Sequence, residues 1–324
     1  MGLSGLFLWL ALRGENWGAI RSQLATADLR WIALTLPLGV YVLYARCQRW
    51  RILLERSHNR SIAMEPIFSA SAIGFMANMV LPFRVGEIAR PYLVARNCGV
   101  SMATTFATVI VERVLDLMAL AVFGVGIVLV AEVPPVVAQL AKLAAALTVV
   151  AFVAGYFITV HRRRVLPVLD VLWAKIPVAG PIVLRLEHEV IDGMTAFTDP
   201  VVLLRTVLWS LYIWLVIALG FGVGFRALGL QIPFVGAGIT VATVVALAVS
   251  VPSAPAFVGQ FEWGCKVALE QVYGVSGSAA VSYSILMHTA QFITQILLGV
   301  VFLVREGMSL GDLSRLDEKV QEPV

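Results

Sequence analysis

Residues 78–90 read Asn-Met-Val-Leu-Pro-Phe-Arg-Val-Gly-Glu-Ile-Ala-Arg, and they break an otherwise apolar part of the chain. The apolar run over residues 67–82 ends at Pro82, and charged side chains follow at once. Proline removes a backbone donor and interrupts a helix, while glycine permits a tight turn. A second break of this kind, Pro-Ala-Phe-Val-Gly-Gln over residues 255–260, follows the apolar run 232–251. The placement of these two breaks decides the expected fold.

The composition around the breaks is that of a membrane protein. The chain has 324 residues, of which 60% are hydrophobic and 14% are charged. A soluble domain is about 45–50% apolar and about 25% charged. A helix needs roughly 20 apolar residues to cross a bilayer. These numbers exclude a water-soluble fold and predict an all-α polytopic integral membrane protein without a large soluble domain.

Hydropathy predicts about six spanning helices. The candidate spans are residues 3–12 (a short one), 31–45, 101–131, 137–160, 201–225 and 278–304. Arginines crowd residues 46–60 and 161–164, and the positive-inside rule places both segments in the cytoplasm as loops. Residues 165–200 alternate apolar and charged residues and predict helices on the cytoplasmic membrane surface. Residues 305–324 are expected to form a short cytoplasmic tail.

The remaining bulk properties argue against several classes of ligand. The net charge of +4 is explained by loop arginines facing anionic lipid, so no nucleic-acid partner is expected. Three cysteines lie far apart in the chain and predict neither disulfides nor a metal site. Because nucleophile, zinc and phosphate-loop motifs are absent from the sequence, we expect no cofactor, no catalytic residue and no enzymatic activity.

The two breaks form an internal repeat. Each contains Pro-x3-Gly, and each is followed by Gly-Val-Ser, at residues 99–101 and 274–276. If residues 62–99 and 232–275 are re-entrant hairpins, three predicted spans separate them, and an odd number of crossings places them on opposite faces. Such an inverted repeat, with interrupted helices near the midplane, is common in secondary transporters. The alternative is a simple kink at each proline, with two full crossings instead of hairpins.

Three charged residues lie together in the predicted span 101–131. Glu112, Arg113 and Asp116 would each cost roughly 2.5–3.5 kcal/mol near the bilayer centre unless they are compensated. We expect Arg113 to pair with Asp116, which is three residues further along the helix. Glu112 then requires Arg84 or Arg90 from the first hairpin. The group is either a structural ion-pair network or the lining of a polar cavity that binds a charged headgroup.

The candidate headgroup site draws on both hairpins and the charged span. Arginine binds phosphate bidentately and stays charged, so Arg84 and Arg90 are the candidate phosphate ligands. Asn78 and Gln260 can add neutral hydrogen bonds, and the acids balance the arginines or face a cationic headgroup. His288, on the last span, is expected to be a hydrogen-bonded packing residue. The candidate set comprises Asn78, Arg84, Glu87, Arg90, Glu112, Arg113, Asp116, Gln260 and Glu262.

These motifs resemble a known family. The stretch 78–90, together with Val-Glu-Arg-Val-Leu-Asp at 111–116 and Pro-Ala-Phe-Val-Gly-Gln-Phe-Glu at 255–262, is similar to the transmembrane domain of lysylphosphatidylglycerol synthases. The resemblance extends over about residues 29–304. It implies a flippase-like domain, here expected to be a single domain over residues 1–304. Since few residues follow, we expect no aminoacyl-transferase domain and no synthesis of lysyl-lipid.

The function expected from the residues and the resemblance is lipid transport. The cargo would be an anionic or aminoacylated phospholipid, or a polyprenyl-phosphate-linked lipid, moved between leaflets through a polar midplane cavity. The alternatives are a membrane-embedded enzyme or accessory subunit of lipid-linked glycan synthesis, and a scaffold with a structural charge network. The partners expected are membrane phospholipid or polyprenyl lipid, a lipid-modifying enzyme, and a second copy of the chain. The location expected is the bacterial or archaeal cytoplasmic membrane, with a cytoplasmic C-terminus.

Overall fold

The computed structural model describes residues 2–130, 133, 135–164, 166, 189–250 and 254–315, and the regular structure in these ranges is helical. The first half contains α1 (Gly2–Leu12), α2 (Trp17–Thr26), α3 (Leu29–His58), α4 (Met64–Val80), the 3-10 turn η1 (Pro82–Arg84), α5 (Gly86–Cys98), α6 (Met102–Val130) and α7 (Pro135–Val160). The second half contains η2 (Thr195–Phe197), α10 (Pro200–Ala227), α11 (Phe234–Ser250), η3 (Pro255–Phe257), α12 (Gln260–Lys266), the π-helical η4 (Val267–Val272), α13 (Gly277–Arg305) and α14 (Leu310–Ser314).

Long apolar helices confirm the all-α polytopic membrane class. Within the described residues, α6, α7, α10 and α13 are long and apolar enough to cross a bilayer. A fifth candidate is α2 with α3, which are bent by 78° at the break between them. Apolar side chains cover the outer surface, and Val130 is 86% exposed. In water such a surface would be costly, whereas lipid accepts it. The predicted number of about six spans stays a prediction.

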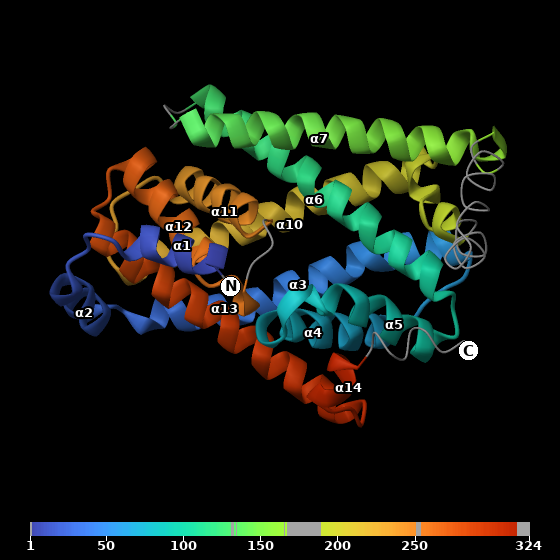
Figure 1. The fold of residues 1–324 in the computed structure, drawn as a ribbon, viewed down its shortest axis with the longest axis horizontal. Coiled ribbons are helices and arrows are strands. Elements are labelled where there is room, and N and C mark those ends of the chain that lie inside the picture. The colour runs from blue at the N-terminus through green and yellow to red at the C-terminus, as the bar shows by residue number, and fades with distance from the viewer. Residues whose placement is uncertain are drawn as a thin grey trace.

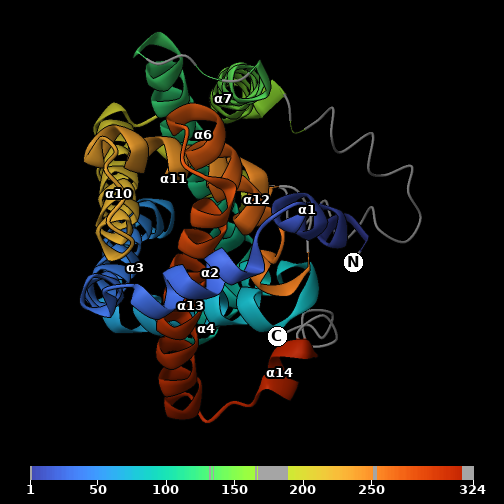
Figure 2. The same ribbon diagram turned by 90° about the vertical axis from the view of Figure 1, so that its left-hand side faces the viewer.

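The helices run roughly along the long axis of the molecule (Figure 1). Figure 2, which looks along that axis, shows α7 at the periphery beside α6. One core lies between α3, α4, α5 and α6, where Trp50, Leu53, Ile73 and Leu93 are fully buried, and a second lies between α10, α11, α12 and α13. Most of the predicted surface-helix segment, residues 165 and 167–188, lies outside the described residues, as do residues 316–324 of the predicted tail.

The expectation of a loop after residue 45 is wrong. α3 continues as one helix to His58 and ends at Asn59, which adopts the left-handed conformation at φ 48°. Arg46 and Arg49 therefore lie on a helix, and Arg49 is buried. The positive-inside rule counts arginines without regard to their partners, and here the partners are carboxylates on α6. Those partners, described below, allow the helix to keep its arginines inside.

Both sequence breaks turn the chain back on itself. α4 and α5 pack together with η1 as their tip, and α11 packs against α12 with η3 as its tip. In Figure 1 the tips lie near the middle of the molecule, while the open ends of the hairpins point to opposite sides. The two tips contact each other. The kinked-crossing alternative therefore does not describe these segments.

The hairpins belong to two copies of one helical pattern. α4 and α11 each have 17 residues, and α6 and α13 each have 29. The hairpins end at Gly99 and Gly274, with φ of 61° and 64°. The packing is exchanged between copies, since α4 contacts α13 and α11 contacts α6, while α3 and α10 contact each other. This reciprocal packing is that of an inverted repeat.

Candidate functional site: a buried arginine–carboxylate cluster

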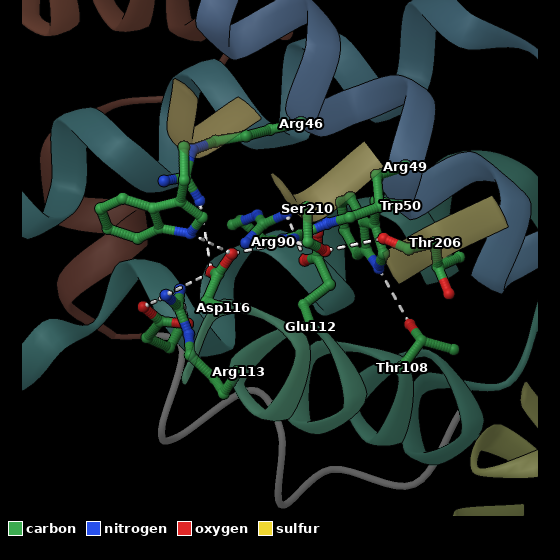
Figure 3. A network of polar contacts seen from close by, with 12 residues as sticks. Arg46, Arg49, Trp50, Arg90, Thr108, Glu112, Arg113, Asp116, Thr206 and Ser210 are labelled. Carbon is green, nitrogen blue, oxygen red and sulfur yellow. Dashed lines mark hydrogen bonds and ion pairs between the residues drawn. The ribbon is translucent and has the colours of Figure 1, made fainter. Parts of the chain in front are cut away.

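The charged residues of α6 meet arginines from α3 and α5 (Figure 3). Glu112 and Asp116 are four residues apart and point from the same face of α6. Arg49 from α3 lies between them, with its Nη1 2.7 Å from Asp116 Oδ1 and its Nη2 3.2 Å from Glu112 Oε1. Arg90 from α5 donates to the other oxygen of Glu112 at 2.9 Å. One carboxylate thus joins three helices.

These charges are almost completely buried and therefore need each other as partners. The side chains of Arg49 and Arg90 are only 1% and 3% exposed, and Glu112 is 3% exposed. Removing one partner from a buried ion pair leaves an uncompensated charge and costs about 3–5 kcal/mol. The guanidinium of Arg90 also lies 4.3 Å from the ring centre of Trp50, and Trp50 donates through its indole N–H to Thr108. These contacts hold α3, α5 and α6 together near the tip of the first hairpin.

Two further side chains, from Arg46 on α3 and Trp214 on α10, donate to Asp116. Arg46 approaches its Oδ2 at 3.3 Å, and the indole N–H of Trp214 on α10 donates to its Oδ1 at 3.1 Å. Arg49 also donates to Ser210 on α10 at 2.8 Å. The cluster therefore connects the first copy of the repeat to α10 of the second copy.

The predicted pairing of Arg113 with Asp116 is confirmed, at 3.7 Å, but it is not the shortest ionic contact of Arg113. Arg113 also bonds both carboxylate oxygens of Glu87 on α5, at 2.5 and 2.8 Å. Arg49 lies closer to Asp116 than Arg113 does, at 2.7 Å. The expectation for Glu112 is met by Arg90 rather than Arg84. Arg113 is 41% exposed, and with Glu87 it forms the open edge of the cluster.

Arg46 and Arg49 are the residues that sequence reasoning missed. Their spacing of three places both on one face of a helix, and no proline or glycine lies between Gly39 and Arg49. Those signals were present in the sequence. The positive-inside rule outweighed them because the carboxylate partners lie more than sixty residues away along the chain.

The cluster holds more arginines than carboxylates. Arg46, Arg49, Arg90 and Arg113 contribute four positive charges, and Glu87, Glu112 and Asp116 contribute three negative ones. Arg84 adds a fifth positive charge at the hairpin tip. Within the described residues Arg84 has no ion-pair partner, because its guanidinium donates to the backbone carbonyl of Val249 and lies 5.3 Å from the ring centre of Phe257.

The two tips share a positive φ at one equivalent position but differ in their chemistry. Arg84 and Phe257 occupy equivalent positions in the two Pro-x3-Gly motifs, and both have positive φ, at 55° and 59°. Asn78 fixes the first tip by accepting a hydrogen bond from the backbone N–H of Gly86 at 2.9 Å. Gly74 and Gly86 let α4 and α5 approach closely, since a Cβ on Gly86 would overlap the carbonyl oxygen of Gly74.

The second-hairpin candidates, Gln260 and Glu262, form no ion pair with the first cluster. Gln260 is completely buried, and its Oε1 accepts a hydrogen bond from Ser4 at 3.4 Å. Its Nε2 has no hydrogen-bond partner among the described residues. Glu262 accepts from the backbone N–H of Gly259 at 2.7 Å and lies 2.5 Å from Nδ1 of His288. The predicted site is thus divided into an arginine-rich part and a histidine–carboxylate part, with the contacting tips between them.

In the part of the chain that the structure describes, no group of three or more His, Cys, Asp or Glu side chains is placed to hold a metal ion. The carboxylates of the main cluster are bonded to guanidinium groups. The chemistry available to the cluster is therefore recognition of a charged group by arginine.

The fold and the cluster define a polytopic helical membrane protein with an inverted repeat and buried charges beside its hairpin tips. Residues 1–299 match the family model described as the lysylphosphatidylglycerol synthase TM region. The chain belongs to this family, and the match includes α1 and α2, which precede the stretch on which the resemblance was based. The family relates the chain to lipid modification or lipid flipping. No curated protein and no solved structure matches the chain.

Proposed function

We propose that the protein moves a lipid with an anionic headgroup between the two leaflets of its membrane without altering the lipid chemically. The observation that carries this proposal is the excess of arginine over carboxylate around the first hairpin. A buried positive charge without a counter-ion is costly in a membrane. A phosphate group would supply the missing negative charge, and its oxygens fit the planar fork of a guanidinium.

Arg84 is the arginine with capacity for such a ligand. The other arginines of the cluster form ion pairs with carboxylates, whereas among the described residues Arg84 forms none and its guanidinium donates to a carbonyl oxygen beside an aromatic ring. Gln260 Nε2, three residues beyond Phe257, is a second donor without a partner. Within the described residues, Arg84 and Gln260 thus each place a donor that lacks a hydrogen-bond partner at the two contacting tips. We propose that these donors bind the phosphate of the headgroup as it passes.

The open edge of the cluster extends the proposal to aminoacylated lipids. Glu87 is partly exposed beside Arg113 and can face an ammonium group while Arg84 faces the phosphate. A phospholipid with a phosphate and an amino acid carries both charges. The acyl chains would stay in the bilayer while the headgroup passes the broken helices, which form the substrate sites of many transporters near the midplane. Polyprenyl-phosphate-linked lipids share the phosphate and belong to the same proposed class.

The test is translocation of fluorescent phosphatidylglycerol in liposomes that contain the purified protein. Arg84→Ala should slow translocation by roughly 10- to 100-fold, because hydrogen bonds to charged groups contribute about 1.5–3 kcal/mol. Arg205→Ala is the matched control, because Arg205 is an exposed arginine on α10 outside the cluster, and it should retain the wild-type rate.

Two outcomes would contradict the proposal. One is an unchanged rate in Arg84→Ala protein whose melting temperature equals that of wild type. The other is equal translocation of phosphatidylglycerol and of a neutral diacylglycerol probe, which would show that the headgroup charge is not recognised. Mass spectrometry of lipids that co-purify with the protein would identify the headgroup directly.

A further inference from the structure

His288 on α13 has a hydrogen-bond acceptor beside each of its ring nitrogens. Nδ1 lies 2.5 Å from the carboxylate oxygen Oε1 of Glu262, and Nε2 lies 2.8 Å from the backbone carbonyl oxygen of Ala256. The histidine is 8% exposed, and the ring of Phe261 stacks on it with 4.5 Å between ring centres. Both nitrogens are therefore shielded from water and directed at oxygen atoms.

The number of protons in this pair follows from the two acceptors. A neutral imidazole has one N–H, so beside an ionised Glu262 one ring nitrogen would point a lone pair at an oxygen lone pair. Both contacts become hydrogen bonds if the pair holds one more proton. That proton lies either on the ring, giving imidazolium beside carboxylate, or on Glu262, which then donates to Nδ1 while Nε2–H donates to Ala256. In both forms the pair has no net charge.

The internal repeat places a comparable pair in the first copy. His288 is 14 residues beyond Gly274, and Arg113 is 14 residues beyond Gly99 (288 − 274 and 113 − 99). Arg113 pairs with Glu87 on the returning helix of the first hairpin, as His288 pairs with Glu262 on the returning helix of the second. The position thus carries a nitrogen-bearing side chain that faces a hairpin carboxylate in both copies.

We infer that His288 and Glu262 form a proton-binding site whose proton holds the tip of the second hairpin in place. The bond from Nε2 ends at Ala256, which has φ of 56°, and the next residue, Phe257, has φ of 59°. Positive φ at residues other than glycine is strained and persists only when the surroundings enforce it. Loss of the proton to solvent converts imidazolium–carboxylate to imidazole–carboxylate and removes one of the bonds that enforce it.

The other titratable groups around the pair do not replace this proton. On α12, Lys266 is 2.5 Å from Glu15 and 3.9 Å from Glu270, so its charge is already compensated. Cys265 on α12 and Tyr283 on α13 are buried and neutral, and Tyr283 donates to the carbonyl of Phe221 on α10. Arg84 on η1 approaches from the first hairpin, with the ring of Phe257 beside its guanidinium.

The contact between Phe257 and Arg84 links the proton to lipid binding, and this step rests on the proposed function. Phe257 is the ring against which Arg84 rests, and it directly follows the residue bonded to His288. Movement of the second tip on proton loss would therefore move a partner of the proposed phosphate ligand. The site would supply the proton that couples to headgroup passage.

The first test measures protonation without any transport. Protein labelled with ¹⁵N-histidine contains four histidines, and His288→Gln assigns the signal of residue 288. Spectra in nanodiscs over about pH 5 to about pH 9 cover the range in which histidine titrates. We expect Nε2 of His288 to be protonated, with the second proton on Nδ1 or on Glu262. Infrared absorption of a carboxylic acid that disappears in Glu262→Gln distinguishes the two. A neutral imidazole beside an ionised Glu262 at about pH 6 would overturn the inference.

The second test follows the tip itself by hydrogen exchange of peptides covering residues 254–266. After correction for intrinsic exchange, the opening equilibrium should rise by up to tenfold per pH unit over the pH range in which the closed tip holds the proton and the opened tip does not, as expected for one linked proton. His288→Gln should remove this dependence, while His161→Gln on the distant end of α7 should keep it. The same dependence in His288→Gln protein would contradict the inference.

A third measurement separates this inference from the proposed function. In liposomes, an imposed pH gradient should change the rate of lipid translocation in wild type but not in His288→Gln. If neither wild type nor any variant translocates lipid while the spectroscopic and exchange results hold, the proton site stands and the proposed function fails. If translocation occurs without the spectroscopic signature, the proton site fails alone.

Discussion

At the scale of single residues, Arg49 is the centre of the ionic cluster. It bonds both acids of α6 and also Ser210 on α10, with its side chain almost fully buried. Neighbouring guanidinium groups cannot replace it, because Arg90 bonds the opposite oxygen of Glu112 and Arg46 the opposite oxygen of Asp116. The cluster is therefore expected to respond very differently to changes at different arginines of the same helix.

We expect Arg49→Ala to destabilise the protein by about 3–5 kcal/mol, because it leaves two buried carboxylates short of a partner. Thermal unfolding in detergent measures the effect. Arg51→Ala is the control on the same helix, since its pair with Glu55 is 34% exposed and worth at most about 1 kcal/mol. Equal melting temperatures for the two variants would show that the cluster contributes little to stability.

Gly86 is a second residue whose identity its neighbours determine, because they leave no room for a side chain. We expect Gly86→Ala to destabilise the first hairpin, because the added Cβ would overlap the backbone of Gly74 and the side chain of Asn78. Gly126→Ala in α6 is the control, because open space surrounds that position and alanine favours helix by about 0.5–1 kcal/mol. Thermal unfolding of both variants should give shifts of opposite sign, or a loss only at Gly86. A tolerated Gly86→Ala would contradict the close crossing of α4 and α5.

At the scale of elements, Glu306 fastens the end of α13 to the first hairpin. Its carboxylate accepts hydrogen bonds from Ser69 on α4 at 2.6 Å and from Arg96 and Asn97 on α5 at 2.7 and 3.0 Å. Partial burial raises the pKa of Glu306, but the hydrogen bonds from Ser69, Asn97 and Arg96 outweigh it and hold the pKa below its ordinary value.

The attachment of α13 to the first hairpin through Glu306 should weaken at low pH. A carboxyl group whose pKa is lowered by folding contributes stability above its unfolded pKa of about 4.3, and that stability is lost as the pH falls through the folded pKa. We therefore expect the melting temperature of wild type to fall more steeply below about pH 4 than that of Glu306→Gln, which lacks the titrating group. Parallel curves would show that Glu306 does not hold the hairpin.

The two hairpins show how one backbone pattern can carry two chemistries. Three equivalent positions have Arg84, Glu87 and Arg90 in the first copy, and Phe257, Gln260 and Trp263 in the second. The tips keep their positive φ and their mutual contact in spite of this exchange. The shared positive φ thus does not depend on the charge of the side chain at that position.

At the scale of the whole molecule, the inverted repeat makes a prediction about sidedness. The loop before α4 and the loop before α11 are separated by the first hairpin and three long helices, so they should face opposite sides of the membrane. In a Cys98→Ser background, Ser61→Cys and Gln231→Cys place one thiol in each exposed loop, while Cys47 and Cys265 are buried. A membrane-impermeant maleimide should label Gln231→Cys in intact cells and Ser61→Cys only after lysis.

That result would also test the proposed cytoplasmic position of the arginine-rich ends and of the C-terminus. Labelling of both thiols from the same side would contradict the inverted arrangement. The reverse pattern would keep the inverted repeat but overturn the orientation taken from the arginine-rich segments.

Several features were determined by the sequence itself. Hydropathy alone indicates the membrane class, the three long helices between the hairpins, and the two breaks at Pro82 and Pro255. The repeated Pro-x3-Gly motif indicates two related hairpins. These features are local, since each depends on residues within about 20 positions along the chain.

Only the tertiary structure decided which charges meet. Glu112 lies 63 residues from Arg49 in sequence, and Asp116 lies 67 from it, so no spacing rule connects them. The structure also places Arg46 and Arg49 in a helix instead of an expected loop, gives Arg113 a second and closer partner in Glu87, and places His288 between Glu262 and Ala256. Hydropathy assigns a cost to each buried charge, but the geometry of folding determines which neighbour compensates it.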